Sequence, residues 1–378
     1  MWVIRKILAT VDSLRPIMDP GCARLLAAEP VHAVRVGLVV PTSGLLGLVG
    51  PAAINCAELA TAELNAEGGL LGRTVELVLV DGGRPAAEVA AEVGALVRAG
   101  AVHAIVGLHP SDVRLAVAPA IGAAVPYVFT PPYEGGENSP GVYLAGETPG
   151  SQLRPTLRWL AEQGRGRRWF LLGNDYVWPR RVHAAAHRYL AEVGATVVGE
   201  QYVVRGAVDP QPLLDRITAA RVDSVLLTLI GRDLVVFNRA FAGSALAQRV
   251  LRLCPALEEN GLLGVGGDTT GELYATMGYF ATVATDTSLE FAAAYGRRFG
   301  PHAPVPGAHS ESCYEGVKLL AALAEKAGTL ATAAIDAVAD GTSWLGARGR
   351  LLVRRRHAVA PTYLARADGL DLDVVTSF

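Results

Sequence analysis

Residues 34–44 read Val34-Arg35-Val36-Gly37-Leu38-Val39-Val40-Pro41-Thr42-Ser43-Gly44, a short run rich in valine that stops at a proline. Such a run is typical of a buried strand of a parallel sheet that ends in a loop. A predicted helix follows, with apolar positions through residues 54–64, and it ends at Gly68-Gly69. The order of strand, loop and helix predicts an α/β fold.

The same alternation continues along the chain. Further strands are predicted at residues 75–80, 103–106 and 125–129, with helices at 86–98 and 113–123. A second series starts after residue 150, with predicted helices at 153–162, 180–193, 213–220 and 234–241 and strands at 168–172, 196–204 and 224–229. The last part carries predicted helices at 289–299, 310–326 and 332–339 and short strands at 350–354, 362–366 and 372–375. Strands joined by helices form right-handed βαβ units, so we predict two doubly wound parallel-sheet lobes.

The composition excludes several classes of protein. Hydrophobic residues make up 51% and charged residues 19% of the 378 residues, which is too apolar for a disordered chain. Lys plus Arg total 34 against 36 for Asp plus Glu, so the chain has no strong field for nucleic acid or an anionic membrane. The chain has four cysteines, which stand far apart in the sequence: Cys22, Cys56, Cys254 and Cys313. We therefore predict free thiols, with two disulfides as the alternative for an exported protein.

The loops after the predicted strands are the place to look for a ligand site, because ligands of open α/β sheets lie beyond the carboxyl ends of the strands. Ser111 is predicted to cap the helix that follows it, and the amides there favour a carboxylate or an amide carbonyl of a ligand. The alternative is a cap without a ligand. Tyr176 and Trp178 predict an aromatic wall, with a hydrophobic plug beside the hinge as the alternative.

No pattern in the sequence indicates catalysis, a metal site or a cofactor. The H-E-x-x-H, G-x-S-x-G and Walker motifs are missing, and G-x-G-x-x-G does not follow the first strand. The glycine-rich residues 264–268 are interpreted as a flexible loop, and the basic run Arg354-Arg355-Arg356-His357 as a solvated turn. We therefore expect a protein that is not an enzyme, binds no cofactor and binds no metal, with an enzyme on the same two-lobe architecture as a weaker alternative.

Two early segments resemble the opening of the type I periplasmic-binding-protein family, in its branched-chain amino acid, amide and urea branch. They are residues 36–44 and Glu63-Leu64-Asn65-Ala66-Glu67-Gly68-Gly69-Leu70-Leu71-Gly72-Arg73. Three further segments are most similar to amide-sensing regulators of aliphatic amidase expression: Thr130-Pro131-Pro132-Tyr133-Glu134-Gly135, Gly173-Asn174-Asp175-Tyr176-Val177-Trp178-Pro179-Arg180 and Cys313-Tyr314-Glu315-Gly316-Val317-Lys318. The resemblance covers residues 34–366.

The resemblance implies a hinged clamp that closes on a small ligand, with three chain crossings between the lobes. Residues 34–148 and 284–345 would form lobe 1, and residues 149–283 and 346–378 would form lobe 2. The implied ligand-binding residues are His109, Ser111, Phe129, Thr130, Pro131 and Tyr133 from lobe 1 and Tyr176, Trp178, Leu229 and Ile230 from lobe 2.

The chain departs from the amide sensors at four of these positions. Tyrosines of the sensors are replaced by His109, Phe129 and Trp178, and a threonine by Pro131. The implied ligand is a short amide, a urea derivative or an amino acid, and the lost hydroxyl groups also favour a larger or more apolar solute.

The segment before the first strand bears on the cellular compartment. Residues 1–33 are interpreted as an N-terminal extension, because no uninterrupted apolar run of about 7 to 15 residues precedes Cys22. We therefore expect a cytoplasmic ligand sensor that signals to a protein partner by lobe closure, with no membrane insertion. The alternative is an exported, membrane-associated lipoprotein that serves as the binding subunit of an ABC transporter for amides, urea or branched-chain amino acids. A homo-oligomer is compatible with either role.

Overall fold

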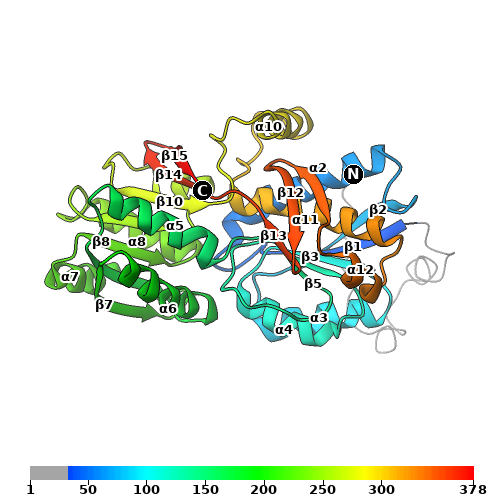
Figure 1. Cartoon of the computed structure of the whole chain (residues 1–378), viewed down its shortest axis with the longest axis horizontal. Coiled ribbons are helices and arrows are strands. Elements are labelled where there is room, and N and C mark those ends of the chain that lie inside the picture. Colours follow the sequence, from blue (N-terminus) through cyan, green and yellow to red (C-terminus); the bar gives the residue numbers. More distant parts are fainter. Residues whose placement is uncertain (1–32) are drawn as a thin grey trace.

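The computed structural model describes residues 33–378, which form two α/β lobes side by side (Figure 1). The predicted fold class is confirmed: each lobe has a sheet with a parallel core and helices on its faces. The interpretation of residues 1–33 and of Cys22 lies outside the described residues, apart from Ala33, which opens the first strand.

Lobe 1 is built on an eight-stranded sheet in the order β11-β12-β13-β5-β4-β3-β1-β2. Its parallel part consists of β1 (Ala33–Val40), β2 (Thr74–Asp81), β3 (Ala104–Gly107), β4 (Tyr127–Phe129) and β5 (Val142–Leu144). Three later strands extend the sheet beyond β5, namely β11 (Ser343–Gly346), β12 (Gly349–Arg354) and β13 (His357–Val359).

Helices cover both faces of this sheet. On one face α2 packs against α11 and α10, and on the other α3 packs against α4. The helical segments of lobe 1 are the 3-10 turn η1 (Gly47–Val49), α2 (Gly50–Ala66), α3 (Ala86–Arg98), α4 (Ser111–Ile121), α10 (Asp286–Phe299), α11 (Ala308–Ala327) and α12 (Thr332–Val338). The first-strand motif thus forms an internal strand between β3 and the edge strand β2, and Val34, Val36, Val39 and Val40 are fully buried.

Lobe 2 is built on a seven-stranded sheet in the order β15-β14-β10-β9-β8-β6-β7. Its parallel strands are β6 (Arg168–Asn174), β7 (Thr196–Val203), β8 (Ser224–Thr228), β9 (Leu251–Cys254) and β10 (Leu273–Met277). An antiparallel hairpin completes it with β14 (Tyr363–Asp368) and β15 (Asp371–Ser377). The helices are α5 (Pro149–Glu162), α6 (Val177–Glu192), α7 (Pro210–Ala220), α8 (Gly231–Ala242) and α9 (Glu259–Val265).

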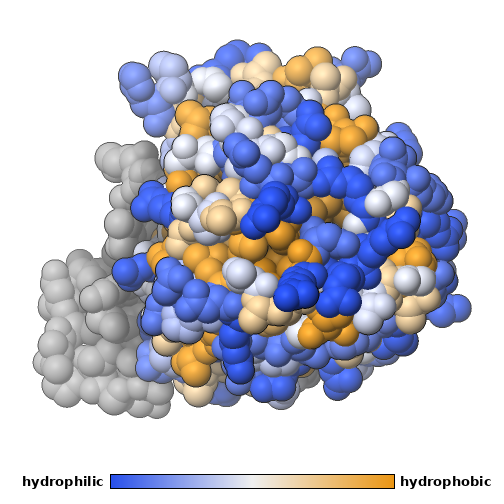
Figure 2. Space-filling view, turned by 90° about the vertical axis from the view of Figure 1, so that its left-hand side faces the viewer, coloured by the Kyte–Doolittle hydropathy of each residue, from blue (hydrophilic) through white to orange (hydrophobic). Residues whose placement is uncertain are grey.

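Figure 2 shows the end of the molecule that lobe 2 forms, turned away from lobe 1. Hydrophobic atoms appear there as patches between hydrophilic side chains, as on ordinary globular surfaces.

The chain crosses between the lobes three times: between β5 and α5, between β10 and α10, and between β13 and β14. The predicted lobe boundary after residue 345 is wrong, because β12 and β13 belong to the sheet of lobe 1. The chain turns back at Ala347 and Arg348, so that Leu351 pairs with Trp344 and Val359 pairs with Leu352 in one antiparallel ladder. The third crossing therefore follows Val359.

The buried guanidinium of Arg348 ties the first crossing to lobe 1. Its Nη1 donates to Glu147 Oε1 at 2.7 Å, and its Nε donates to Glu311 Oε2 of α11 at 2.8 Å. Gly278, on the second crossing, passes so close that a Cβ there would lie 2.3 Å from Nη1. Two of the crossings thus pack around one cation.

The segment from 251 to 277 differs from the sequence-based prediction, which left β9, α9 and β10 unassigned. Residues 264–268 do not form a free loop, because Gly264 and Val265 end α9 and Asp268 is buried. The carboxylate of Asp268 forms an ion pair of 2.7 Å with Arg252, itself fully buried in β9. The basic run at 354–357 forms the turn between β12 and β13, where the Arg356 side chain pairs with Asp336 at 2.9 Å.

Candidate ligand-binding site

The ten residues implied by the resemblance lie beyond the carboxyl ends of the strands of both sheets. Lobe 1 contributes loops after β3 and β4, and lobe 2 contributes loops after β6 and β8. In the first group are His109, Ser111, Phe129, Thr130, Pro131 and Tyr133, and in the second Tyr176, Trp178, Leu229 and Ile230. Loops of both groups reach the cavity between the lobes, which Pro110 and Ile230 line, but several of the ten side chains are parts of the core.

The lobes touch at this seam. The Arg232 N–H, in the first turn of α8, donates to the Leu45 carbonyl of lobe 1 at 3.0 Å. Gly231 has a φ of +50°, and a Cβ at this position would lie 2.0 Å from the Leu45 oxygen. Asp81 fixes the loop that carries Leu45, because its carboxylate accepts the Thr42 N–H at 2.9 Å and the Ser43 hydroxyl at 2.6 Å. The two lobes are therefore in direct contact at this point.

His109 is a buried wall residue rather than a free polar group. Its Nδ1 lies 3.1 Å from the Pro110 carbonyl and its Nε2 lies 2.8 Å from the Tyr127 hydroxyl. Burial lowers the pKa of His109 to about 4, so the ring is neutral near pH 7 and both nitrogens are used internally. Its ring centroid lies 5.2 Å from that of Phe129, which is fully buried.

A buried arginine supports this wall from behind. The Arg114 guanidinium lies 5.3 Å from the centroid of Phe129 and 5.6 Å from that of Tyr133. It forms ion pairs with Glu134 and Glu137 of the loop between β4 and β5. The Tyr133 hydroxyl is bonded to His357 Nδ1 of β13. Phe129 and Tyr133 thus belong to the core under the site and shape it indirectly.

The predicted capping role of Ser111 is wrong. Helix α4 begins at Ser111 itself, its N-cap residue is Pro110, and no side-chain capping bond is formed at this end of α4. Pro110 has φ −59° and ψ 153°, an extended conformation that places the next residue in the first helical turn. The Ser111 side chain is buried beside the seam, and the nearby Thr130 hydroxyl accepts the Ser312 Oγ–H of α11 at 2.9 Å.

In lobe 2, Asn174 organises the loops, and it was not among the predicted site residues. Its Oδ1 accepts the Ile230 N–H at 2.9 Å, and its Nδ2 donates to Asp233 at 2.7 Å. The carboxylate of Asp233 also accepts the Gly206 N–H at 2.8 Å. One buried amide at the end of β6 therefore joins the loops after β7 and β8, and a polar residue where the apolar run of the strand stops was the signal for it.

The two aromatic residues of the predicted wall have different environments. Their ring centroids lie 6.4 Å apart. Trp178 is buried in the hydrophobic core of lobe 2, which fits the alternative of a plug. Tyr176 is partly buried at the seam, its pKa is raised by burial, and the Arg205 guanidinium lies 4.8 Å from its ring centroid.

Two adjacent carboxylates at the seam were missed from the sequence because β9 was not recognised. Glu258 accepts the Gly261 N–H at 3.1 Å and so caps α9. Glu259 accepts the Ala281 N–H at 2.6 Å through Oε1, whereas its buried Oε2 has no hydrogen-bond partner among the described residues. Burial raises the pKa of both groups, and the charge of Glu258 raises that of Glu259 further.

This acidic pair lies where lobe 2 meets the start of α11. A Cβ on Gly307, just before α11, would lie 1.7 Å from Glu258 Oε2. His309 Nε2 lies 3.3 Å from the Ala256 carbonyl, and burial lowers the pKa of His309 to about 4. The pair therefore presents partly unsatisfied acceptors between the lobes, close to the hinge.

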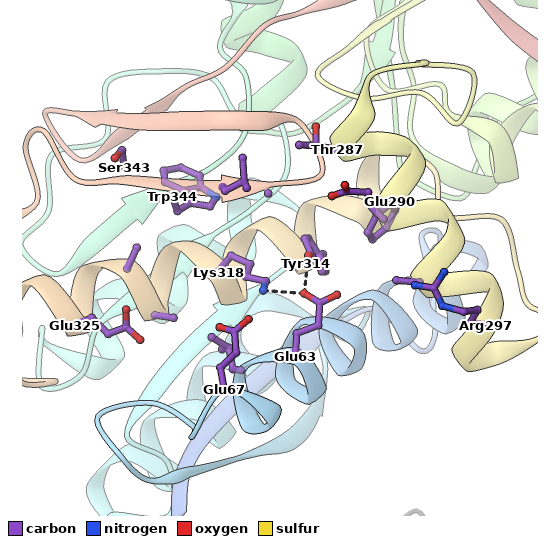
Figure 3. A pocket seen from close by; sticks show the side chains of 17 residues that line it. Glu63, Glu67, Thr287, Glu290, Arg297, Tyr314, Lys318, Glu325, Ser343 and Trp344 are labelled. Carbon is purple, nitrogen blue, oxygen red and sulfur yellow. Dashed lines mark hydrogen bonds and ion pairs between the residues drawn. The ribbon is translucent and has the colours of Figure 1, made fainter.

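Two cavities bear on where a ligand could lie. One, of about 280 Å³, lies between the lobes and is lined by Leu45, Leu46, Pro110, Asp112, Arg205 and Ile230 among others. The other, of about 670 Å³, is a groove of lobe 1 between α2, α10, α11 and β11 (Figure 3). In that groove Glu63 accepts the Tyr314 hydroxyl and pairs with Lys318, both at 2.7 Å. None of the ten implied site residues lines the groove, whereas one of them, Ile230, lines the cavity between the lobes. The cavity between the lobes is therefore the candidate site.

Within residues 33–378, no group of histidine, cysteine and acidic residues is arranged to hold a metal ion. None of the helices in this range is long and apolar enough to span a membrane. Cys56, Cys254 and Cys313 are buried free thiols, as predicted for them.

Comparison with known proteins agrees with this architecture. The family described as periplasmic binding proteins matches residues 33–371, nearly the whole described range. The chain belongs to the periplasmic binding protein family. The resemblance noted in the sequence is thereby confirmed at the level of the family, whereas a closer relation to amidase regulators is not shown.

Solved structures of the family have the same fold. A periplasmic binding protein from Burkholderia mallei matches with a TM-score of 0.81 at 17% identity, over 92% of this chain and 95% of that one. An ABC-transporter solute-binding protein from Rhodopseudomonas palustris, in complex with 3,4-dihydroxybenzoic acid, matches with a TM-score of 0.78 at 23% identity, over 92% of this chain and 97% of that one. A branched-chain amino acid transporter substrate-binding protein from Streptococcus pneumoniae, in complex with isoleucine, matches with a TM-score of 0.77 at 18% identity, over 91% of this chain and 99% of that one.

Proposed function

We propose that this protein is the solute-binding component of an ABC importer and closes its two lobes around a small polar solute. The observation that carries the proposal is the clamp itself, in which loops from both sheets meet at Leu45, Gly231 and Arg232. A protein that captures solutes needs such a movable seam and needs no catalytic group. The relatives named above as transport proteins support this role.

The same relatives favour an exported protein with an ABC permease as its partner over the cytoplasmic regulator expected from the sequence. Fractionation of the native cell tests this assignment. The protein should appear outside the cytosol, either free or attached to the membrane. A full-length protein confined to the cytosol would overturn the export assignment.

The polar groups at the seam favour a ligand with hydrogen-bond donors at one end and an acceptor at the other. The unpaired oxygen of Glu259 suits an ammonium or amide NH₂ group, because a buried acceptor without a partner is costly and a ligand cation would favour the ionised carboxylate, lowering the pKa that burial raises. The amino end of α4, at Ser111, suits a carboxylate or a carbonyl oxygen. Arg114 and Arg205 are already paired with carboxylates, so the seam offers no free cation from them to an aromatic acid. A benzoate lacks the ammonium or amide NH₂ group that Glu259 suits, so an amino acid or a short amide fits better.

A panel of solutes tests both the role and the class. Isoleucine, acetamide, urea and 4-hydroxybenzoate are each added to the purified protein, and thermal and urea unfolding are measured. A true ligand at 100 times its Kd should add about 2.7 kcal/mol to the free energy of unfolding. Glu259→Gln should abolish most of the gain for isoleucine. Stabilisation by 4-hydroxybenzoate alone would refute the solute class, and turnover of any of these compounds would refute the binding role.

A further inference from the structure

We propose that Arg205 and Asp112 form a latch between the lobes, and that Arg205 is the positioning residue that fixes Tyr176 when the clamp closes. The inference rests on the proposed function only in assuming that the lobes open and close. Its test uses the protein without any solute, so failure of the solute panel and failure of the latch are separate results.

The two residues come from different lobes. Arg205 lies in the loop after β7, and Asp112 is the second residue of α4. The guanidinium meets the carboxylate through two contacts, Nη2 to Oδ2 at 2.5 Å and Nη1 to Oδ1 at 3.3 Å. This two-pronged geometry is the strongest form of an arginine–carboxylate pair. Any rotation that separates the lobes at this point must break it.

The position of each partner is fixed within its own lobe. The Gly206 N–H, next to Arg205, donates to the buried Asp233, which in turn accepts from Asn174. Asp112 lies in the first turn of α4, where the amides and the helix dipole favour a negative charge. Because neither the loop of Arg205 nor the first turn of α4 has to become ordered when the lobes meet, formation of the ion pair costs less conformational entropy.

The latch also acts on a residue of the candidate site. The Arg205 guanidinium lies 4.8 Å from the ring centroid of Tyr176, within the usual range of a cation–π contact, while its nitrogens hold Asp112. The same guanidinium therefore contacts an aromatic side chain of lobe 2 and a carboxylate of lobe 1. When the pair forms, Tyr176 is held at the seam in one orientation.

The magnitude expected for this pair is modest. The side chains of Arg205 and Asp112 are 34% and 27% exposed, so the pair resembles a partly solvated surface ion pair. Such pairs change an equilibrium by about two- to fivefold, and salt weakens them. We expect the ratio of closed to open protein to fall by that factor when either partner is removed.

Exchange of the Arg232 amide hydrogen measures the open fraction directly, because this amide is bonded to Leu45 across the seam. The neighbouring Ile230 amide is bonded to Asn174 within lobe 2 and serves as an internal reference. Both amides are followed by NMR in the full chain, in 50 mM and 500 mM sodium chloride.

The variants are Arg205→Met, Asp112→Asn and the two combined. Each single variant should speed exchange at Arg232 about two- to fivefold and leave Ile230 unchanged, and the double variant should add nothing further. High salt should speed exchange in the wild type but not in the variants. The matched control is Arg180→Met, which removes an ion pair of 2.7 Å with Asp175 that lies wholly within lobe 2. The latch would be overturned if Arg205→Met and Asp112→Asn exchanged at Arg232 no faster than the control variant. It would also be overturned if the effects of the two single variants added up in the double variant.

Discussion

Replacing Gly231 by alanine should block closure of the clamp while leaving each lobe folded. Gly231 begins α8 with a φ of +50°, and it faces the Leu45 carbonyl of the other lobe. The substitution adds one methyl group beside the backbone hydrogen bond that joins Arg232 to Leu45 of the other lobe.

Two costs follow from the structure, and they act on different equilibria. A left-handed backbone at an alanine costs roughly 1 to 2 kcal/mol, and it is paid whether the clamp is open or closed. A Cβ at this position would lie 2.0 Å from the Leu45 oxygen, about 1.5 Å short of an ordinary contact. Relieving that clash breaks the Arg232 bond to Leu45, worth about 1 kcal/mol, and separates the surfaces around it. We therefore expect solute affinity to fall at least about tenfold.

The assay is a titration of the solute that stabilises the wild type most, paired with urea unfolding without solute. The matched control is Gly194→Ala, in the turn before β7, where φ is +70° and a Cβ would meet nothing within 4 Å. Both variants should lose a similar free energy of unfolding, but only Gly231→Ala should lose affinity. Equal affinities in the two variants would show that the bound form does not close at Leu45, and the argument from this contact would fail.

Three further predictions concern buried charge. Arg114→Met should lower the free energy of unfolding, measured in urea, by about 3 to 5 kcal/mol, because Glu134 and Glu137 lose their buried cation. The control is Arg84→Met, which removes a half-exposed ion pair with Glu92 and should cost less than about 1 kcal/mol. Burial raises the pKa of Glu259, so the folded state keeps a proton that the unfolded chain releases above about pH 4.3. The wild-type free energy of unfolding should therefore fall as the pH rises from about 4.3 toward neutral. Glu259→Gln should flatten this slope when urea unfolding is measured at several pH values. The pH dependence expected from His109 has the opposite sign, because its pKa of about 4 lies below the unfolded value of about 6.5. Acidification from about pH 6.5 to about pH 4 should remove up to about 3 kcal/mol of the free energy of unfolding, and His109→Gln should lose this dependence. An unchanged slope in the Glu259 or the His109 variant would assign the titration to other groups.

The strands and helices with a clear apolar period could be predicted from the sequence. Residues 86–98 were predicted as a helix and form α3 with the same bounds, and the first valine-rich strand starts one residue before its predicted position. Strand β9 was missed because Arg252 interrupts its apolar run, and only the distant Asp268 makes that arginine compatible with a buried strand. Local pattern carries no information about such partners.

The candidate site was predictable as a set of loops but not as a set of contacts. The ends of β3, β4, β6 and β8 were found because parallel strands place their loops at one edge. The role of Ser111 was wrong because Pro110 takes the capping position. Glu259, Asn174 and Arg205 were missed because their roles depend on Ala281, Ile230 and Asp112, which lie 22, 56 and 93 residues away in the sequence.

The three crossings also affect how the chain can fold during synthesis. The sheet of lobe 1 begins with β1 but is complete only when β11, β12 and β13 have joined it, and the sheet of lobe 2 waits for β14 and β15. A ribosome delivers these strands last, so in the nascent chain the sheet edge at β5, and later also the one at β10, stays unpaired until the final strands are made. Lobe 1 can therefore be completed only when β13 has been made and lobe 2 only when β15 has been made, so the two-lobed clamp is complete only after the end of the chain is released.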